Sequence, residues 1–280
     1  MKVAKITTIP DYIKWVNECH KIIIPKHNLS FSQDHVYFRG HASTSWELIP
    51  SLFRDSGRLH DEHKMLLYAN NMLWAELKDC HSALEKMIKL QHYGLHTRLL
   101  DVTFNPLVAL FFACQVSSKP DDDKNGAIYC GYKEDYNIRI SQAIAEYVFN
   151  NDFITIKEKD LEKICTTYNI HRIHLEHAHF INPPQNNQRI SAQNGAFIMS
   201  PLLSKQTKTP LKYANKECIK IEMEAAFSSK AIISKDDKEK LLKELDYLGF
   251  NKATIFTDIS NKLQYINEKE DKEWPIIDLS

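Results

Sequence analysis

The sequence predicts an α+β fold around one hydrophobic core. Short segments rich in aromatic and β-branched residues, typical of strands, are interspersed with segments whose apolar residues recur at helical spacing. The two kinds of segment do not follow the regular strand–helix order of a doubly wound sheet. Of the 280 residues, 43% are hydrophobic, which is enough to fill a core. The length predicts one or two domains, and no internal repeat or low-complexity linker divides the chain.

The helical segments share apolar residues spaced three and four apart. They lie within an N-terminal segment, residues 1–30, and over residues 59–92, 107–114, 140–149, 159–168 and 236–248. Asn105-Pro106 opens the third segment, because proline is tolerated in the first turn of a helix. Gly94 and Gly249 follow the second and the last, where glycine commonly ends a helix.

Strands are expected where aromatic and β-branched residues cluster. The expected strands are residues 35–40, 126–131, 189–199 and 218–223, with a loop or short strand at 95–103 and a strand or turn at 253–256. Gln193-Asn194-Gly195 falls inside the third, which indicates a bulge or a close backbone approach. Residues 133–180 are the least regular part of the chain, and the tail at 267–280 is charged.

Composition narrows the class of protein. Lys plus Arg and Asp plus Glu number 36 each, so no chain-wide electrostatic footprint for nucleic acid exists, although a local basic patch is still compatible with this balance. The six cysteines are scattered without a Cys-x-x-Cys pair, which indicates free thiols in a reducing compartment. The N-terminus is too polar for a signal peptide, and no apolar run approaches the ~20 residues of a membrane helix. We expect a soluble, cytoplasmic protein without a membrane partner.

Two groups of polar residues are candidates for chemistry. Arg39 ends an aromatic strand before Gly40; its fork of donors suits phosphate or carboxylate, and a glycine permits close approach of a ligand. A structural ion pair with a buried carboxylate would explain this arginine equally well. Further polar side chains gather between two apolar helices, which indicates a network of helix caps or a site. They are Gln91, His92, His96, Thr97, Arg98, Asp101 and Thr103.

Other patterns give weaker evidence of a functional site. Asp101 could simply pair with Arg98, and Thr103 could cap the helix that begins near Pro106. The histidine-rich segment, residues 171–179, has no Asp or Cys at a usual zinc spacing, so we expect surface histidines and no metal. No Walker loop, Gly-x-Gly-x-x-Gly, Gly-x-Ser-x-Gly or His-Glu-x-x-His occurs, which excludes the commonest nucleotide, esterase and protease sites.

Three sequence blocks resemble a known family. Tyr37-Phe38-Arg39-Gly40 resembles the motif that names the FRG domain, residues 91–113 are similar to its central block, and residues 189–197 are similar to its third. The resemblance covers most of residues 31–266, with 133–180 as an irregular insertion. FRG domains resemble the ADP-ribosyltransferase fold, which implies a split mixed or antiparallel sheet with a helical N-terminal part and helical insertions.

The resemblance also implies a ligand and a set of site residues. In the arginine-containing branch of that fold, the arginine of an aromatic-Arg-Gly motif holds the phosphates and the nicotinamide ribose of NAD, and a threonine helps to seat it. NAD is therefore the expected co-substrate. The expected binding residues are Tyr37, Arg39, Gly40, His92, Thr97, Arg98 and Thr103.

The branch also uses a carboxylate that stabilises the positively charged transition state. The third block offers Gln193, which is neutral. Glu222 and Glu224 would share one face of a strand, and Asp101 is the other carboxylate that could approach the site. Arg39, Asp101, Gln193, Glu222 and Glu224 are the candidate catalytic residues.

Three functional hypotheses stay open. The first is an NAD-dependent ADP-ribosyltransferase that modifies nucleic acid or protein, as a bacterial toxin or phage-defence effector restrained by an antitoxin. The second is a non-catalytic module that binds a nucleotide or nucleic acid. The third is a nuclease-like hydrolase with His92 or His96 as base and Arg39 on phosphate. A carboxylate within reach of Arg39 would favour the first.

Overall fold

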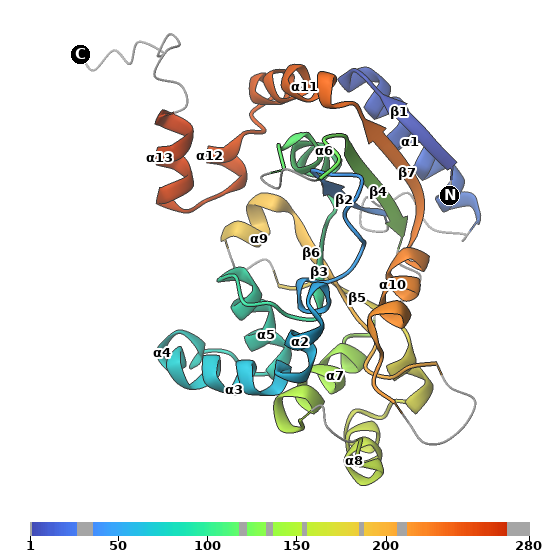
Figure 1. Cartoon of the computed structure of the whole chain (residues 1–280), viewed down its shortest axis with the longest axis vertical. Helices are drawn as coiled ribbons and strands as arrows, with labels where there is room; N and C mark the ends of the chain where they lie inside the picture. Colours follow the sequence, from blue (N-terminus) through green and yellow to red (C-terminus); the bar gives the residue numbers. More distant parts are fainter. Residues whose placement is uncertain are drawn as a thin grey trace.

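The chain forms a seven-stranded mixed sheet with helices around it. The computed structural model describes residues 2–26, 36–117, 122–132, 137–152, 156–184, 188–205 and 212–267. The strand order is β1-β7-β4-β2-β3-β6-β5, in which β1 and β7 run parallel and the other neighbours are antiparallel (Figure 1). The strands are β1 (Lys2–Ile6), β2 (Val36–His41), β3 (Leu99–Thr103), β4 (Gly126–Tyr132), β5 (His179–Ile181), β6 (Gly195–Met199) and β7 (Phe227–Ile233).

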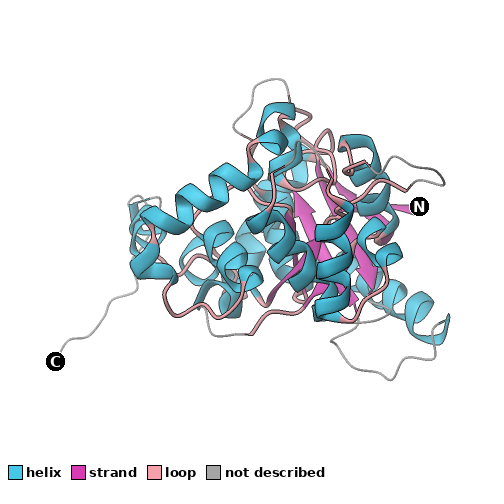
Figure 2. Cartoon of the chain, turned by 90° about the horizontal axis from the view of Figure 1, so that it is seen from below, coloured by secondary structure: helices cyan, strands magenta, loops and turns pink. Residues whose placement is uncertain are grey.

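Helices account for most of the remaining described residues and enclose the strands (Figure 2). They are α1 (Ile9–Lys26), α2 (Ser56–His60), α3 (Glu62–Met72), α4 (Trp74–Leu77), α5 (Ala83–His92), α6 (Pro106–Cys114), α7 (Ile138–Asn150), α8 (Glu158–Tyr168), α9 (Gln188–Gln193), α10 (Lys216–Ala225), α11 (Lys235–Tyr247), α12 (Lys252–Ile255) and α13 (Ile259–Asn267). Two 3₁₀ turns, η2 (Ser51–Arg54) and η3 (Arg172–Glu176), complete the set. No helix in the described ranges combines the length and the apolar character that a membrane span requires.

The expected helices largely form where the sequence places them. The long stretch at 59–92 divides into four helices, α2 to α5, and ends at Gly94, whose φ of 96° suits glycine. The side chain of Asn105 accepts a hydrogen bond from the Leu107 amide and Pro106 lies in the first turn of α6, as the Asn-Pro pair predicts. The segments at 140–149, 159–168 and 236–248 are helical as α7, α8 and α11, and Gly249 has a φ of 82°.

Alternation along β2 directs its residues to two different cores. Phe38 faces the cluster that contains α1, α6 and α11, whereas Tyr37 faces a cluster built from η2, α10 and the opposite side of the sheet. A third cluster joins α3, α5, α7 and α8 to the ends of β3 and β6. Arg39 lies two residues after Tyr37, so its side chain is on the same face of β2. The candidate site described below is on this face.

Gly40 lies where the main chain of α6 packs directly on β2. A Cβ atom at this position would lie 2.0 Å from the carbonyl oxygen of Ala109 and 2.8 Å from the amide nitrogen of Ala113. The glycine is therefore required for packing of the helix on the strand. It does not open the backbone to a ligand, as the sequence had suggested, because main chain of α6 occupies the space.

Three expected strands are wrong in whole or part. Residues 188–193 form α9, Asn194 adopts a φ of 44°, and only residues from Gly195 onward are strand. Residues 218–223 lie in α10, because Ile219 and Met223 are buried four residues apart and the Asn215 side chain caps the helix. In the segment 253–256, the residues up to Ile255 belong to α12, and a capping box at Asn251 starts this helix.

Three strands were not expected. β1 precedes α1, so the N-terminal segment adds an edge strand as well as a helix, pairing in parallel with β7. β7 itself follows α10 directly, and β5 forms the other edge of the sheet over three residues. Apart from Asn267, which ends α13, the charged tail lies outside the described residues.

Candidate functional site

The candidate site lies where β2 and β3 diverge. The two strands pair at Phe38 and Thr103, whereas β2 pairs with β4 over six residue pairs. Beyond Phe38 the side chain of Arg39 takes over the connection to β3, because its Nη1 donates to the main-chain carbonyl of Asp101. An arginine side chain thus links the two strands next to the one position at which they pair.

Arg39 is held on two sides and is 13% exposed. Its Nε donates to Nε2 of His41 over 2.8 Å, and its Nη1 lies 3.9 Å from Oδ2 of Asp101. Burial lowers the pKa of Arg39 to about 10, although Asp101 opposes the shift. The guanidinium is thus still protonated at neutral pH, in a position where water screens its charge poorly.

His41 is the buried partner of this arginine, and the sequence analysis did not single it out. The imidazole is 1% exposed and packs against Tyr129 and Trp46, with ring centroids 5.2 and 5.8 Å away. Burial, and then the charge of Arg39, lower the pKa of His41 well below its usual value. Strand parity could have identified it, because residues 39 and 41 of one strand share a face.

Asp101 presents a carboxylate from the middle of a central strand. Its side chain is 65% exposed, although both neighbours in β3 are buried. Oδ1 accepts a hydrogen bond of 2.9 Å from Nε2 of Gln91 on α5, and Oε1 of Gln91 accepts from the hydroxyl of Thr97. Three of the predicted polar residues therefore form one hydrogen-bonded chain that ends beside Arg39.

Two further arginines add positive charge around this carboxylate. Burial lowers the pKa of Arg54 on η2, Asp101 opposes that shift, and Arg58 on α2 adds to it. Burial, then Arg58 and Arg54, also lower the pKa of His96. η2 is tied to the site because the Leu52 amide donates to the Thr97 carbonyl over 3.3 Å. The environment of Asp101 is thus rich in arginine, which suits an anionic ligand.

Comparison with known proteins identifies this region. Residues 34–122 match the family model of the FRG domain. The chain contains an FRG domain. The matched residues include β2, η2, α5 and β3, the elements that build the candidate site. No curated protein and no solved structure matches the chain. The predicted extension of the domain to residue 266 stays a prediction, although β6 and β7 complete the same sheet.

Two predicted residues of the FRG domain are engaged elsewhere. Arg98 is 1% exposed and forms a bidentate pair with Glu62, so it does not pair with Asp101. Tyr37 is buried too; its hydroxyl donates to the Ala226 carbonyl over 2.6 Å and its ring stacks on Phe180. We assign structural roles to both side chains.

Thr103 and Gln193 meet at the far end of β3. The Thr103 hydroxyl donates to the Gln193 carbonyl over 2.6 Å and accepts from the Asn105 amide over 2.9 Å. The side-chain amide of Gln193 donates to the main-chain carbonyl of Ile255 over 3.3 Å. The expectation that Thr103 caps α6 is wrong, because Asn105 is the N-cap; the Thr103 hydroxyl instead holds the residue that precedes the helix. Neither side chain is directed to Arg39 by these contacts.

Glu222 and Glu224 belong to α10, so they do not share a strand face. Glu222 is buried beside Nζ of Lys205 at 2.6 Å and Nδ1 of His177 at 3.4 Å, whereas Glu224 is exposed. His92 lies among the charges of Arg189 and Asp258, and burial lowers its pKa. In the described part of the chain, no three His, Cys, Asp or Glu side chains are arranged to hold a metal ion.

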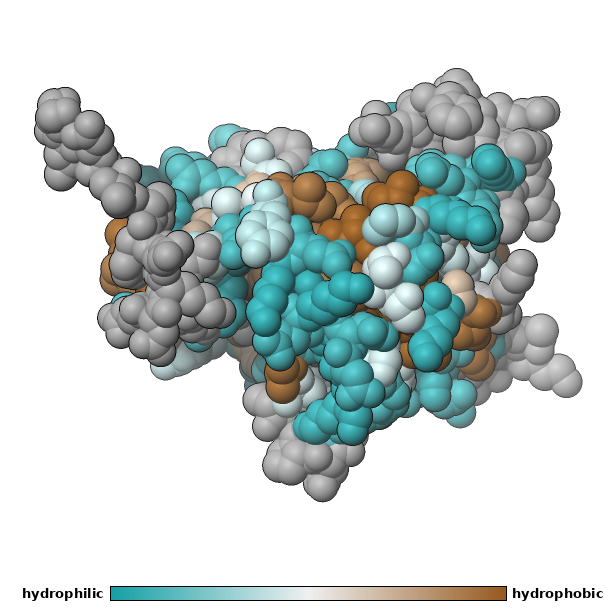
Figure 3. Space-filling view, turned by 90° about the horizontal axis from the view of Figure 1, so that it is seen from above, coloured by the Kyte–Doolittle hydropathy of each residue, from teal (hydrophilic) through white to brown (hydrophobic). Residues whose placement is uncertain are grey.

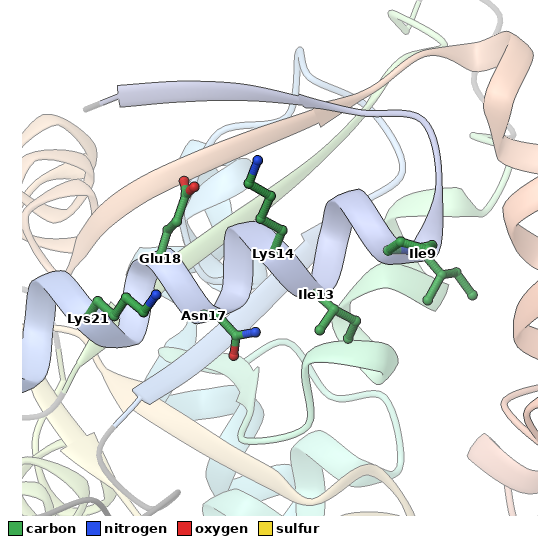
Figure 4. A pocket seen from close by; sticks show the side chains of 7 residues that line it. Ile9, Ile13, Lys14, Asn17, Glu18 and Lys21 are labelled. Carbon is green, nitrogen blue, oxygen red and sulfur yellow. The ribbon is translucent and has the colours of Figure 1, made fainter.

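A hollow on the described surface lies in a different part of the molecule. It measures about 540 Å³ and is lined by α1 residues between Ile9 and Lys21. Lys14 and Glu18 point one way from the helix and Ile13 and Asn17 the other, and all the lining side chains come from this one helix (Figure 4). The face viewed from the α11 side is mostly hydrophilic, with apolar side chains in small areas (Figure 3). We therefore do not take the α1 hollow or this face as the candidate site.

Proposed function

We propose that the FRG domain is an NAD-dependent ADP-ribosyltransferase that acts at the divergence of β2 and β3. The observation that carries this proposal is the Asp101 carboxylate, 3.9 Å from the Arg39 guanidinium. An aromatic-Arg-Gly strand with a carboxylate in reach is the combination that the resemblance to ADP-ribosyltransferases requires. A binding module would need the arginine alone.

Arg39 suits the role of holding the diphosphate of NAD. Its guanidinium is charged at neutral pH, largely shielded from water and fixed by two hydrogen bonds. Charge-assisted hydrogen bonds from a fixed guanidinium to phosphate oxygens are strong and directional. Arg54 and Arg58 would add long-range attraction, because their charges already act on the groups around Asp101.

Asp101 suits the role of the catalytic carboxylate. Breakage of the bond between nicotinamide and ribose places positive charge on the ribose, and a nearby carboxylate stabilises that charge. Gln91 fixes one oxygen of Asp101 and leaves the other beside Arg39. Thr97 holds Gln91 in turn, so this threonine supports the carboxylate through a neighbour.

Some of the residues that were expected to bind NAD are available to do so, and others are not. Arg39 and Asp101 supply an anion-binding group and a carboxylate, whereas Tyr37 and Arg98 are committed to internal contacts. His92 is not among the groups that contact Arg39, and His96 is an exposed imidazole whose pKa is lowered. Neither histidine that the hydrolase hypothesis names as its base has a defined contact with the arginine, so the transferase is favoured.

Incubation of the purified full chain with NAD labelled in its adenylate part, in a cell lysate, tests the proposal. Label is expected in either the protein or the nucleic-acid fraction, which names the acceptor, and is expected to disappear with Arg39→Lys and Asp101→Asn. Absence of transfer and of nicotinamide release, with NAD still bound, would favour the binding module. Growth arrest on cytoplasmic expression, relieved by Asp101→Asn, would support a toxin or phage-defence role restrained by an antitoxin.

A further inference from the structure

His41 has an environment that a side chain with a packing role alone does not require. The imidazole sits two residues after Arg39 on the same face of β2, is 1% exposed, and contacts the rings of Tyr129 and Trp46. An aromatic residue would satisfy that packing without burying polar atoms. The polar atoms matter because burying them without hydrogen bonds costs free energy.

The contact with Arg39 fixes the state of the ring. A guanidinium has only donors, so the Nε–H of Arg39 can bond to Nε2 of His41, 2.8 Å away, only when Nε2 carries a lone pair. The ring is then neutral, with its proton on Nδ1. The charged groups that act on it are Arg39 on β2, Arg54 on η2 and Lys230 on β7, all cationic, and the Trp46 main chain opposes their effect on the pKa of His41.

The same contact fixes the plane of the guanidinium. Nε is bound to His41 and Nη1 to the Asp101 carbonyl, and a planar group held at two of its nitrogens cannot rotate. Among the described residues these are the hydrogen bonds that Arg39 makes, so its Nη2 edge is left for a ligand. A carboxylate at position 41 would also accept from Nε, but it would neutralise the positive charge.

We propose that His41 is a positioning residue, whose neutral Nε2 orients Arg39 so that Nη2 meets a ligand of the diphosphate class without loss of the arginine's charge. This inference rests on the proposed function in one respect, the assignment of Arg39 to an anion. It adds that the affinity for the anion depends on a side chain that does not itself touch the ligand.

Two measurements on the full chain test this inference. The first is the ¹⁵N–¹⁵N scalar coupling across the hydrogen bond between Arg39 Nε and His41 Nε2, in deuterated, ¹⁵N-labelled protein. The second is the Kd for inorganic pyrophosphate in wild type, His41→Phe and His41→Gln. Phenylalanine keeps the ring packing and removes the acceptor, whereas the glutamine carbonyl can replace Nε2. His81→Phe, at an exposed position before α5, controls for the introduced ring.

The expected results are a measurable coupling in wild type and weaker pyrophosphate binding by about tenfold in His41→Phe, the size of one lost charge-assisted hydrogen bond. Glutamine should restore most of the affinity. Absence of the coupling, equal affinities in wild type and His41→Phe, or no binding of pyrophosphate by wild type would each overturn the inference. If the coupling and the affinities follow expectation but NAD is not consumed, the inference stands and the transferase proposal fails.

Discussion

Arg98 and Glu62 form a bidentate ion pair in the interior, with Nε 2.8 Å from Oε1 and Nη2 2.5 Å from Oε2. Each side chain is 1% exposed. The pair joins the segment before β3 to the first turn of α3, and Nη1 of Arg98 donates to the Pro201 carbonyl over 3.2 Å. The pair thus fixes the chain just before β3, the strand on which Asp101 faces solvent.

Removing one partner of this pair should be costly. Glu62→Leu leaves a buried guanidinium without its counter-charge and should lower the free energy of unfolding by about 3–5 kcal/mol. The double variant Glu62→Leu with Arg98→Met should recover most of that loss, because no charge is left buried. Urea denaturation measures both. Glu239→Ala, in an exposed pair with Lys243 on α11, is the control and should cost under about 1 kcal/mol. A similar loss in the control and in Glu62→Leu would contradict the assignment.

Gly40 should tolerate no side chain. The added methyl of Gly40→Ala would lie 2.0 Å from a main-chain oxygen of α6, so α6 and β2 must separate, at a cost of about 3 kcal/mol or more. Gly195→Ala is the matched control in β6, because the nearest atom to its Cβ is 3.5 Å away. Thermal unfolding of the two variants should differ clearly. Equal melting temperatures would show that α6 can move without strain.

His41 should make stability depend on pH. The pKa of His41 lies below its usual 6.5 in the folded state, so on acidification the unfolded chain takes up a proton that the folded chain does not. The stability contributed by neutral His41 is present above pH 6.5 and is lost as the pH falls. The loss should reach about 1.4 kcal/mol per pH unit for this one proton.

Comparison with His41→Gln isolates this contribution. The pKa values of His92 and His179 are also lowered by burial. Both residues therefore reduce stability on acidification in wild type and in the variant alike. Urea midpoints between pH 7 and pH 5 should therefore fall less steeply in the variant than in wild type. Parallel slopes would mean that His41 protonates as readily in the folded chain as in the unfolded chain.

The sequence predicted the parts of the site that depend on local order. The cluster of aromatic and β-branched residues predicted the strand that carries Arg39, and the Asn-Pro pair predicted the helix that begins after Asp101. It could not predict the partner of Arg98, because Glu62 lies 36 residues earlier and appears in the sequence as an ordinary surface glutamate of a helix. Long-range pairs of this kind arise from packing, which a local pattern does not encode.

The assignment of the carboxylates failed for a different reason. Glu222 and Glu224 alternate as a strand would require, but Ile219 and Met223, four apart, also fit a helix. A seven-residue apolar pattern cannot separate the two, and the Asn215 cap together with burial of the helical stripe against the sheet decides for α10. In a helix, residues two apart point to nearly opposite sides, so one glutamate is buried and the other exposed.

Asp101→Asn should separate activity from stability. The amide oxygen of asparagine can still accept the hydrogen bond from Gln91, and the side chain is 65% exposed, so the free energy of unfolding should change by less than about 0.5 kcal/mol. The negative charge beside Arg39 is lost, and with it the stabilisation of positive charge on the ribose, so NAD turnover should fall by about 100-fold or more while binding of NAD persists. Glu217→Gln, at an exposed position on α10, serves as the control. Nicotinamide release and NAD titration measure the two quantities, and unchanged turnover in Asp101→Asn would remove this carboxylate from the reaction.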